Sequence, residues 1–137
     1  LVLNMFLWRC IVFLDSTKFF NSNTWRKKRL REGKMILDNS IIRNFAPQEG
    51  EDVIWKSDRS AFRDTNLEQL LVPGQKVYCT GAATTGCVLA TAIDGDALGY
   101  EMIFVGDCMF DKNEERHAKG LLLLSKFGKI IKSHDIL

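Results

Sequence analysis

The positions of apolar residues predict short strands that alternate with helices from Glu51 to the end of the chain. Runs rich in β-branched and aromatic residues are typical of strands. They are EDVIWK (51–56), KVYCTG (76–81), YEMIFVGD (100–107) and KIIKS (129–133), and residues 11–14 supply one more run upstream. Short strands separated by helical stretches predict right-handed βαβ units on a parallel sheet.

The stretches between these runs carry helix signals. Residues 84–98 place apolar side chains four positions apart, and Gly99 stands where a left-handed C-cap belongs. Residues 114–127 predict another helix, closed by Gly128. Within residues 60–71, LEQLL (67–71) predicts a shorter helix, with Asp64 or Thr65 as a possible N-cap and the following Pro-Gly pair as its end. The chain therefore has the element order of an α/β domain.

Composition favours a single globular domain over residues 1–137. This length suits one core, and the shares of 46% apolar and 26% charged residues are ordinary for a folded protein. The net charge of +2 is too small to indicate a nucleic-acid partner. The basic run WRKKRLR (25–31) either binds a polyanion or lies solvated on the surface. The near balance of the remaining charge favours the second interpretation.

Cysteine usage indicates a reducing compartment. No two cysteines form a Cys-x-x-Cys pair, and Cys79 and Cys108 lie inside apolar strand-like runs. Reduced thiols in the cytoplasm fit this pattern better than a disulfide framework. We expect Cys79 and Cys108 to be buried on both faces of the sheet and therefore unreactive.

The N-terminal segment LVLNMFLWRCIVFL is apolar but does not predict a membrane span or a signal peptide. Asn4 and Arg9 interrupt it, whereas a span needs about 18–20 apolar residues. The following VFLDSTKFF offers no small-residue cleavage site. We expect a buried segment without membrane association. The missing initiator Met further leads us to expect a fragment.

Two candidate site residues lie at the carboxyl ends of predicted strands, where open parallel sheets bind ligands. Lys56 closes its strand, and Cys87 follows the next strand across the turn GAATTG. If these strands are neighbours, both side chains reach the same edge of the sheet. Cys87 also lies in the first turn of a helix, where the helix dipole and a nearby ammonium group favour a thiolate. A strand, a tight turn and a helix are a known way to present a nucleophile.

Both candidates also have an ordinary structural interpretation. Most free cysteines are small buried hydrophobic residues, and a lysine at the end of a strand more often points to water. Position alone leaves both interpretations of Cys87 open.

A set of linked motifs around these two residues decides between the interpretations. It comprises Lys56, Ser-Ala-Phe (60–62), Thr-Asn-Leu (65–67), Gly-x-x-Thr-x-x-Cys (81–87) and Thr-Ala (91–92). Together they resemble the signature of the isochorismatase-like cysteine hydrolases over roughly residues 25–137. The Thr-Thr-Gly-Cys form is most similar to the N-carbamoylsarcosine and maleamate amidohydrolase branch.

The resemblance implies a three-layer α/β/α fold with a mainly parallel sheet. It also implies a Cys–Asp–Lys triad that hydrolyses a C–N bond in a small amide or carbamoyl compound through a thioester. Cys87 would be the nucleophile, and Lys56 would support its ionisation. A cis bond between Ala82 and Ala83 would lie beside the oxyanion hole, with the N–H groups of Ala83 and Cys87 as donors. A homo-oligomer without a cofactor is expected.

The Asp of this triad has no clear counterpart. Asp15 ends the run IVFLD, which aligns better with the family's second strand. If LVLNMF is a degraded first strand, Asn4 takes the Asp position, and an amide cannot accept the thiol proton. We therefore expect residues 1–24 to be a remnant of the N-terminal part. Either the first strand is missing from this chain or the protein has lost its base.

No metal is expected at this site. The family's nicotinamidases bind a metal through an Asp-x-His pair and a later His near the second strand, whereas DSTKFF (15–20) contains no His. His117 falls on a predicted helix and His134 near the C-terminus. Both are expected to be surface or structural residues.

Three functions remain open, in decreasing order of support. The first is an amidohydrolase with a small-molecule amide substrate. The second is a catalytically inactive relative that keeps the fold for binding or assembly, which the absent Asp favours. The third is an anion-binding domain that uses GAATTG at a helix start. It ranks last because the chain lacks both G-x-G-x-x-G and the P-loop pattern.

Overall fold

A computed structural model of the chain describes residues 12–15 and 52–136. Its two compact units, Leu1–Ser57 and Asp58–Leu137, are described separately. The expectation of a single domain over residues 1–137 therefore stays a prediction. Asn4, Cys10 and the basic run 25–31 lie outside the described residues.

The first unit contains two parallel strands. Strand β1 (Val12–Asp15) pairs with β2 (Val53–Lys56), and the register sets Asp15 opposite Lys56. Both strands were predicted, at residues 11–14 and 51–56. Ile54 and Lys56 are both buried, with 4% and 5% of their surface exposed. The pair thus ends with a buried lysine at its carboxyl edge.

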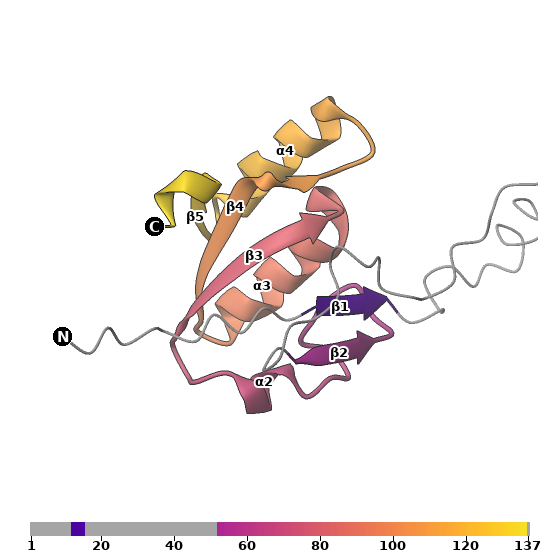
Figure 1. Ribbon diagram of the computed structural model, residues 1–137, viewed down its shortest axis with the longest axis vertical. Coiled ribbons are helices and arrows are strands. Elements are labelled where there is room, and N and C mark those ends of the chain that lie inside the picture. The colour runs from indigo at the N-terminus through magenta and orange to yellow at the C-terminus, as the bar shows by residue number, and fades with distance from the viewer. Residues whose placement is uncertain (1–11, 16–51, 137) are drawn as a thin grey trace, which may run out of the picture. The chain divides into compact units, whose positions relative to one another are not determined.

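The second unit is built on a parallel sheet of three strands in the order β3-β4-β5 (Figure 1). These are β3 (Lys76–Ala82), β4 (Glu101–Phe110) and β5 (Gly128–Ile131). All three were predicted from their apolar runs. Residues 102–106 of β4 are buried in succession, which is typical of a central parallel strand covered on both faces.

Helices connect these strands. They are α2 (Leu67–Leu70), the π-helical turn η2 (Thr84–Val88), α3 (Leu89–Ala97), α4 (Glu114–Leu124) and the terminal 3-10 turn η3 (Ser133–Asp135). The crossovers through α3 and α4 step along the sheet in the same direction, so right-handed connections place both helices on one face. Contacts of α3 and α4 with β4 and with each other agree with this. A second helical layer is not among the described residues.

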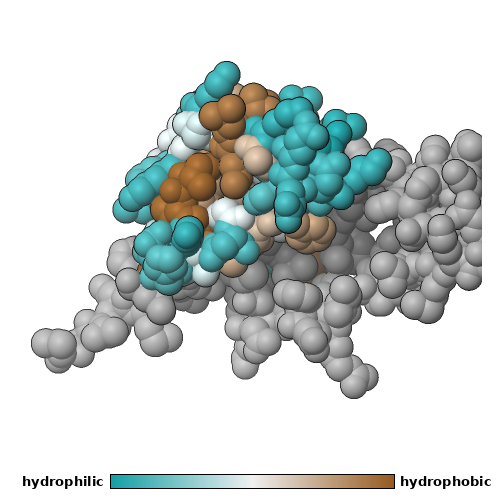
Figure 2. All heavy atoms as spheres, turned by 90° about the horizontal axis from the view of Figure 1, so that it is seen from above, coloured by the Kyte–Doolittle hydropathy of each residue, from teal (hydrophilic) through white to brown (hydrophobic). Residues whose placement is uncertain are grey.

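The core of the second unit lies between these helices and the sheet. Phe104 and Leu124 are completely buried there, and the ring of Phe62 stacks on Tyr100 with 5.4 Å between centroids. Some apolar side chains remain at the surface, such as Leu122 at 71% and Phe110 at 66% exposure. Figure 2 accordingly shows apolar side chains among hydrophilic ones.

Some predicted ends of elements agree with the structure and others differ, such as the N-cap of α2, which is Asn66 and not Asp64 or Thr65. Gly99 has a φ of +83° after α3, as expected of a left-handed cap. Gly128, however, does not close a helix. It begins β5, where a Cβ would collide with the backbone oxygen of Met102. Glycine therefore allows β5 to approach β4 closely at this position. Strand β4 also runs three residues beyond the predicted end at Asp107, because a register shift opposite Cys79–Gly81 lengthens it.

Among the described residues, no helix is both long and apolar enough to cross a membrane.

Candidate active site

Cys87 lies just beyond the carboxyl end of β3, at a break between two helical segments. It belongs to η2, and α3 starts two residues later. Gly86, immediately before it, has φ −112° and ψ −106°, which no helix contains. Cys87 itself is half-buried. The predicted arrangement of strand, tight turn and helix start is therefore present.

The turn before Cys87 is closed by its own backbone. The carbonyl oxygen of Ala83 accepts hydrogen bonds from the N–H of Gly86 at 2.9 Å and of Val88 at 3.3 Å. The peptide bond between Ala82 and Ala83 is cis, as the resemblance predicted. The roles of Ala82, Ala83 and Cys87 in an oxyanion hole stay predictions.

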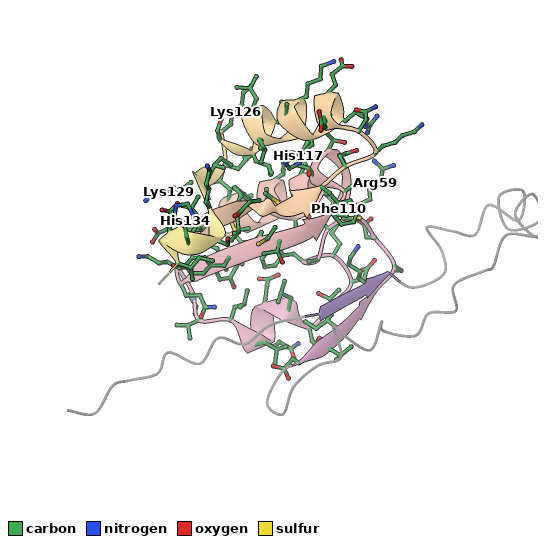
Figure 3. The ribbon with its side chains drawn as sticks, turned by 45° about the horizontal axis from the view of Figure 1, so that its top comes forward. Arg59, Phe110, His117, Lys126, Lys129 and His134 are labelled. Atoms are coloured by element: carbon green, nitrogen blue, oxygen red, sulfur yellow. The ribbon has the colours of Figure 1, made fainter. Side chains whose placement is uncertain are left out.

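Thr84 fixes the turn to helix α4. It is fully buried, and its Oγ1 lies 2.8 Å from Nδ1 of His117. His117 points from α4 toward the start of α3 (Figure 3). Gly120, one turn further along α4, has no room for a Cβ, which would lie 2.6 Å from Cγ2 of Thr84. His117 therefore has the structural role that was predicted for it.

Thr85 is held by a carboxylate from the end of β4. Its N–H and its hydroxyl both donate to Oδ2 of Asp111, each at 2.7 Å. Oδ1 of Asp111 accepts from the N–H of Lys112 at 2.7 Å and from Nε of Arg116 at 3.0 Å. Arg116 closes a ring, because its Nη2 donates to the hydroxyl of Thr85 at 2.8 Å.

The surroundings of Asp111 keep it ionised. The N–H and hydroxyl of Thr85 hold the pKa of this carboxyl far below its usual range, and Lys112 and Arg116 act in the same direction. Only 2% of its side chain is exposed. A buried carboxylate with so many donors is a fixed anchor for the turn rather than a group that exchanges protons near neutral pH.

The motif after the lysine strand is anchored to α3. The N–H of Ala61 donates to Oγ1 of Thr91 at 3.0 Å, and Arg63 bonds Asp94 through Nε at 2.9 Å. Thr65 donates to the carbonyl oxygen of Ala61 at 2.6 Å and so closes the loop on itself. The Ser-Ala-Phe and Thr-Ala motifs, 30 residues apart in sequence, therefore meet on the helix that follows Cys87.

Lys56 lies in the first unit, and its meeting with Cys87 stays a prediction. The register partner of Lys56 is Asp15 on β1. Strand β3 pairs with β4, and no ladder between described residues joins β2 to β3. The expectation that the strands of Lys56 and Cys87 are direct neighbours is therefore not met by a described pairing.

The other described cysteines differ from expectation in part. Cys79, which was expected to be buried on both faces of the sheet, is half-buried, and desolvation raises the pKa of its thiol to about 12. Cys108, which was expected to be buried, is exposed. The reason is a register shift between β3 and β4. Cys79 pairs with Phe104 but Gly81 pairs with Met109, so residues 105–108 of β4 are not paired with β3.

The described residues offer no ready metal site. No group of three or more His, Cys, Asp and Glu side chains in residues 12–15 and 52–136 is arranged to hold a metal ion. His134 is exposed, and its Nε2 lies 3.4 Å from the neighbouring Asp135. The expected absence of a metal stays a prediction for the whole chain.

Sequence reasoning missed Asp111, Thr85 and Arg116 as members of the site. Asp111 and Arg116 flank Asn113, whose side chain caps α4 by accepting from the N–H of Arg116 at 2.9 Å. A strand end followed by an N-cap was visible in the sequence. What was not visible is the register that sets Phe110 beside Ala82 and so brings Asp111 to the turn.

Known proteins resemble this chain over most of its length. The model of the isochorismatase domain matches residues 8–135. The maleamate amidohydrolase of Pseudomonas putida is 32% identical over 123 residues, which cover 85% of this chain and 58% of that protein. The N-carbamoylsarcosine amidase of Arthrobacter sp. is 39% identical over 69 residues, covering 49% of this chain and 26% of that protein.

A solved structure agrees with these sequence matches. An isochorismatase-like hydrolase from Alkaliphilus metalliredigens superposes with a TM-score of 0.69 at 33% identity, covering 75% of this chain and 59% of that one. The chain spans less than two thirds of the length of each of these relatives.

Proposed function

The chain belongs to the isochorismatase family and has its α/β fold, and on that premise we propose that it forms part of a cysteine hydrolase. The proposed reaction cleaves a C–N bond in a small amide or carbamoyl compound. The observation that carries the proposal is the position of Cys87: half-buried, beyond the carboxyl end of β3 and at the start of a helix. Ligands bind at that edge in open α/β sheets.

The names of the relatives support the type of bond. Maleamate amidohydrolase and N-carbamoylsarcosine amidase are both named for the cleavage of an amide or carbamoyl group. The Gly-x-x-Thr-x-x-Cys motif that suggested this branch forms the turn around Cys87. We therefore propose a primary amide or a ureido acid as the substrate.

The proposed chemistry has two steps. The thiolate of Cys87 forms a C–S bond with the carbonyl carbon, the C–N bond breaks, and the leaving nitrogen takes a proton and departs as ammonia. Water then attacks the thioester, or the thiocarbamate that a ureido substrate forms, which releases a carboxylic acid or a carbamic acid and restores the thiol. Backbone N–H groups of Ala83 and Cys87 would stabilise the developing oxyanion.

We propose that Lys56 supports the thiolate. The motif set supports this role, since Lys56 and Cys87 are the lysine and the cysteine of the linked motifs that resemble the family signature. Asp15, the register partner of Lys56, becomes the first candidate for the missing carboxylate.

The test is ammonia release from maleamate, N-carbamoylsarcosine and simple primary amides. We expect release to depend on Cys87 and to be lost in Cys87→Ala, while Cys108→Ala, which removes an exposed thiol, retains it. If Asp15 supplies acid–base help, Asp15→Asn lowers kcat/KM by about 10²–10⁴-fold. Release that persists in Cys87→Ala would contradict the proposal.

The alternative is a catalytically inactive relative that keeps the fold for binding or assembly. The lack of a clear counterpart for the family's Asp in the sequence favours it. Substrate binding without ammonia release, in a folded chain with a reactive Cys87, would support this alternative.

A further inference from the structure

We propose that Asp111 is a positioning residue for Cys87, which it controls through Thr85. Arg116 fixes the carboxylate and the hydroxyl of Thr85 together. The geometric part stands on the contacts in the second unit alone, whereas its consequence for catalysis rests on the proposed function.

One carboxylate oxygen fixes both the backbone and the side chain of Thr85. Oδ2 of Asp111 accepts from the N–H and from the hydroxyl of this residue, each at 2.7 Å. Two bonds to one oxygen leave the φ and χ1 angles of Thr85 little freedom. Hydrogen bonds to a charged acceptor are also about twice as strong as neutral ones.

Thr85 is well placed to set the direction of Cys87, because only Gly86 separates them. Glycine has the widest conformational freedom of any residue, and Gly86 here adopts the non-helical angles that turn the chain into α3. Without a fixed residue before it, Gly86 would be free to rotate. The position of the Cys87 sulfur and N–H therefore depends on the anchoring of Thr85.

The anchor itself is rigid. Asp111 directly follows β4, whose last residue Phe110 pairs with Ala82. Nε of Arg116 approaches Oδ1 to 3.0 Å from the first turns of α4. Asp111 is thus held between the end of β4 and the first turn of α4, and it fixes Thr85, which lies 26 residues earlier in the sequence.

A matched control exists in the same strand. Asp107 accepts from the N–H of Ser133 through Oδ1 at 2.8 Å and from its hydroxyl through Oδ2 at 2.7 Å, so one carboxylate again holds one hydroxyl residue, here through both of its oxygens. Ser133 follows β5, which lies on the other side of β4 from β3, the strand that leads to Cys87; Figure 3 accordingly draws His134, next to Ser133, apart from Phe110, next to Asp111. Asp107→Asn therefore removes a comparable pair of bonds that does not involve the turn before Cys87.

The experiment measures the rate of alkylation of Cys87 by iodoacetamide at neutral pH, followed by peptide mass spectrometry, in the folded full chain. We expect Asp111→Asn and Thr85→Val to slow it about fivefold or more, since the sulfur leaves the favourable helix start. Thr85→Ser, which keeps the hydroxyl, and Asp107→Asn should stay within about twofold of the wild type. In a chain that turns over amide, kcat should fall up to about 10²-fold with little change in KM.

Cys87 alkylation at the wild-type rate or faster in folded Asp111→Asn would overturn the proposal. If that variant does not fold, Thr85→Val decides, because it keeps Asp111 and removes only the hydroxyl. An equal loss of rate in Asp107→Asn would also overturn the proposal, since it would show a general loosening. An absence of amide turnover in every variant, with the expected alkylation rates, would contradict the proposed function and leave the positioning role supported.

Discussion

The described cysteines sit in three different environments, and this decides their reactivity at the scale of single residues. Cys87 and Cys79 are both half-buried, Cys87 at a helix start and Cys79 within β3, whereas Cys108 is exposed where the register between β3 and β4 shifts. The thiolate is the reactive form, so both access and ionisation matter. Exposure alone favours Cys108, whereas the helix start favours Cys87.

We predict that iodoacetamide at neutral pH labels Cys87 before Cys108 and leaves Cys79 unlabelled. The pKa of about 12 leaves Cys79 almost entirely protonated at pH 7. Mass spectrometry of brief reactions gives the order. Labelling in guanidinium chloride, where all cysteines should react alike, is the control. Early labelling of Cys79 in the folded chain would show that β3 is misassigned.

Asp111 also predicts how stability depends on pH. Its pKa is lower in the folded chain than in the unfolded chain, where Asp titrates near about 4. The carboxylate therefore contributes stability above that pH, and the contribution is lost as the pH falls toward the folded pKa. Asp107 and Asp94, whose pKa values are also lowered, act in the same direction.

We predict that acidification from pH 6 to about pH 3 destabilises Asp111→Asn less than the wild type, because the variant has no such carboxylate to protonate. Urea unfolding followed by circular dichroism at several pH values measures this. Asp107→Asn serves as a comparison because Asp107 is exposed. Its acid-induced loss of stability should differ less from that of the wild type than the loss in Asp111→Asn does. Parallel pH curves for the wild type and Asp111→Asn would contradict the assignment.

At the scale of elements, helix α4 packs against the turn before Cys87 through a small residue, Gly120, and a branched residue, Thr84. Gly120 is buried, and a Cβ there would lie 2.6 Å from Cγ2 and 3.0 Å from Cβ of Thr84. Glycine costs a helix about 1 kcal/mol relative to alanine. Its presence within α4 is therefore explained by packing against Thr84 rather than by the helix itself.

We predict that Gly120→Ala lowers the free energy of unfolding by about 1–3 kcal/mol through overpacking. In a Thr84→Ser background, which removes Cγ2 but keeps Cβ, the same change should cost less, since the closest contact is gone and the gain in helix propensity offsets part of the remaining overpacking. Lys119→Ala, at an exposed ion pair with Glu115, is the neighbouring control and should change little. Additive effects of the two substitutions would refute the contact.

The elements themselves were largely predictable from the sequence, and the reasons are local. Continuous apolar runs defined the strands, and Gly99 ended α3 because only a left-handed residue fits there. The irregular part of β4 was not predictable, since its register depends on pairing with β3. The exposure of Cys108 follows from that pairing, so the prediction that both sheet cysteines are buried is wrong for Cys108 and met only in part for Cys79, which is half-buried.

The candidate site divides in the same way. Cys87 was identified from its place after a strand and from its motif, both of which are local in sequence. The anchor through Asp111 joins positions 26 residues apart, and no short pattern encodes such a contact. Periodicity finds elements, whereas a positioning contact between elements is known only from their packing.

At the scale of the whole molecule, the proposed hydrolysis draws on both units. Cys87 and its anchor belong to the second unit, and Lys56 with its register partner Asp15 belongs to the first. The Ser-Ala-Phe motif begins four residues after Lys56, in the second unit, where the N–H of Ala61 is hydrogen-bonded to Thr91 of α3. A buried lysine is costly unless its charge is compensated, so the burial of Lys56 is itself consistent with a functional role.

We predict that Lys56→Met slows the alkylation of Cys87 about tenfold at neutral pH, because a nearby ammonium group favours the thiolate. Lys56→Arg keeps the positive charge and should lower the alkylation rate of Cys87 less than Lys56→Met does. Lys76→Met removes an exposed lysine at the start of β3, the end of that strand away from Cys87, and should leave the rate unchanged. Thermal unfolding of each variant shows whether the chain still folds. Equal alkylation rates in folded Lys56→Met and wild type would mean that Lys56 does not act on Cys87, and the thiolate would then depend on the helix start and its anchor at Asp111.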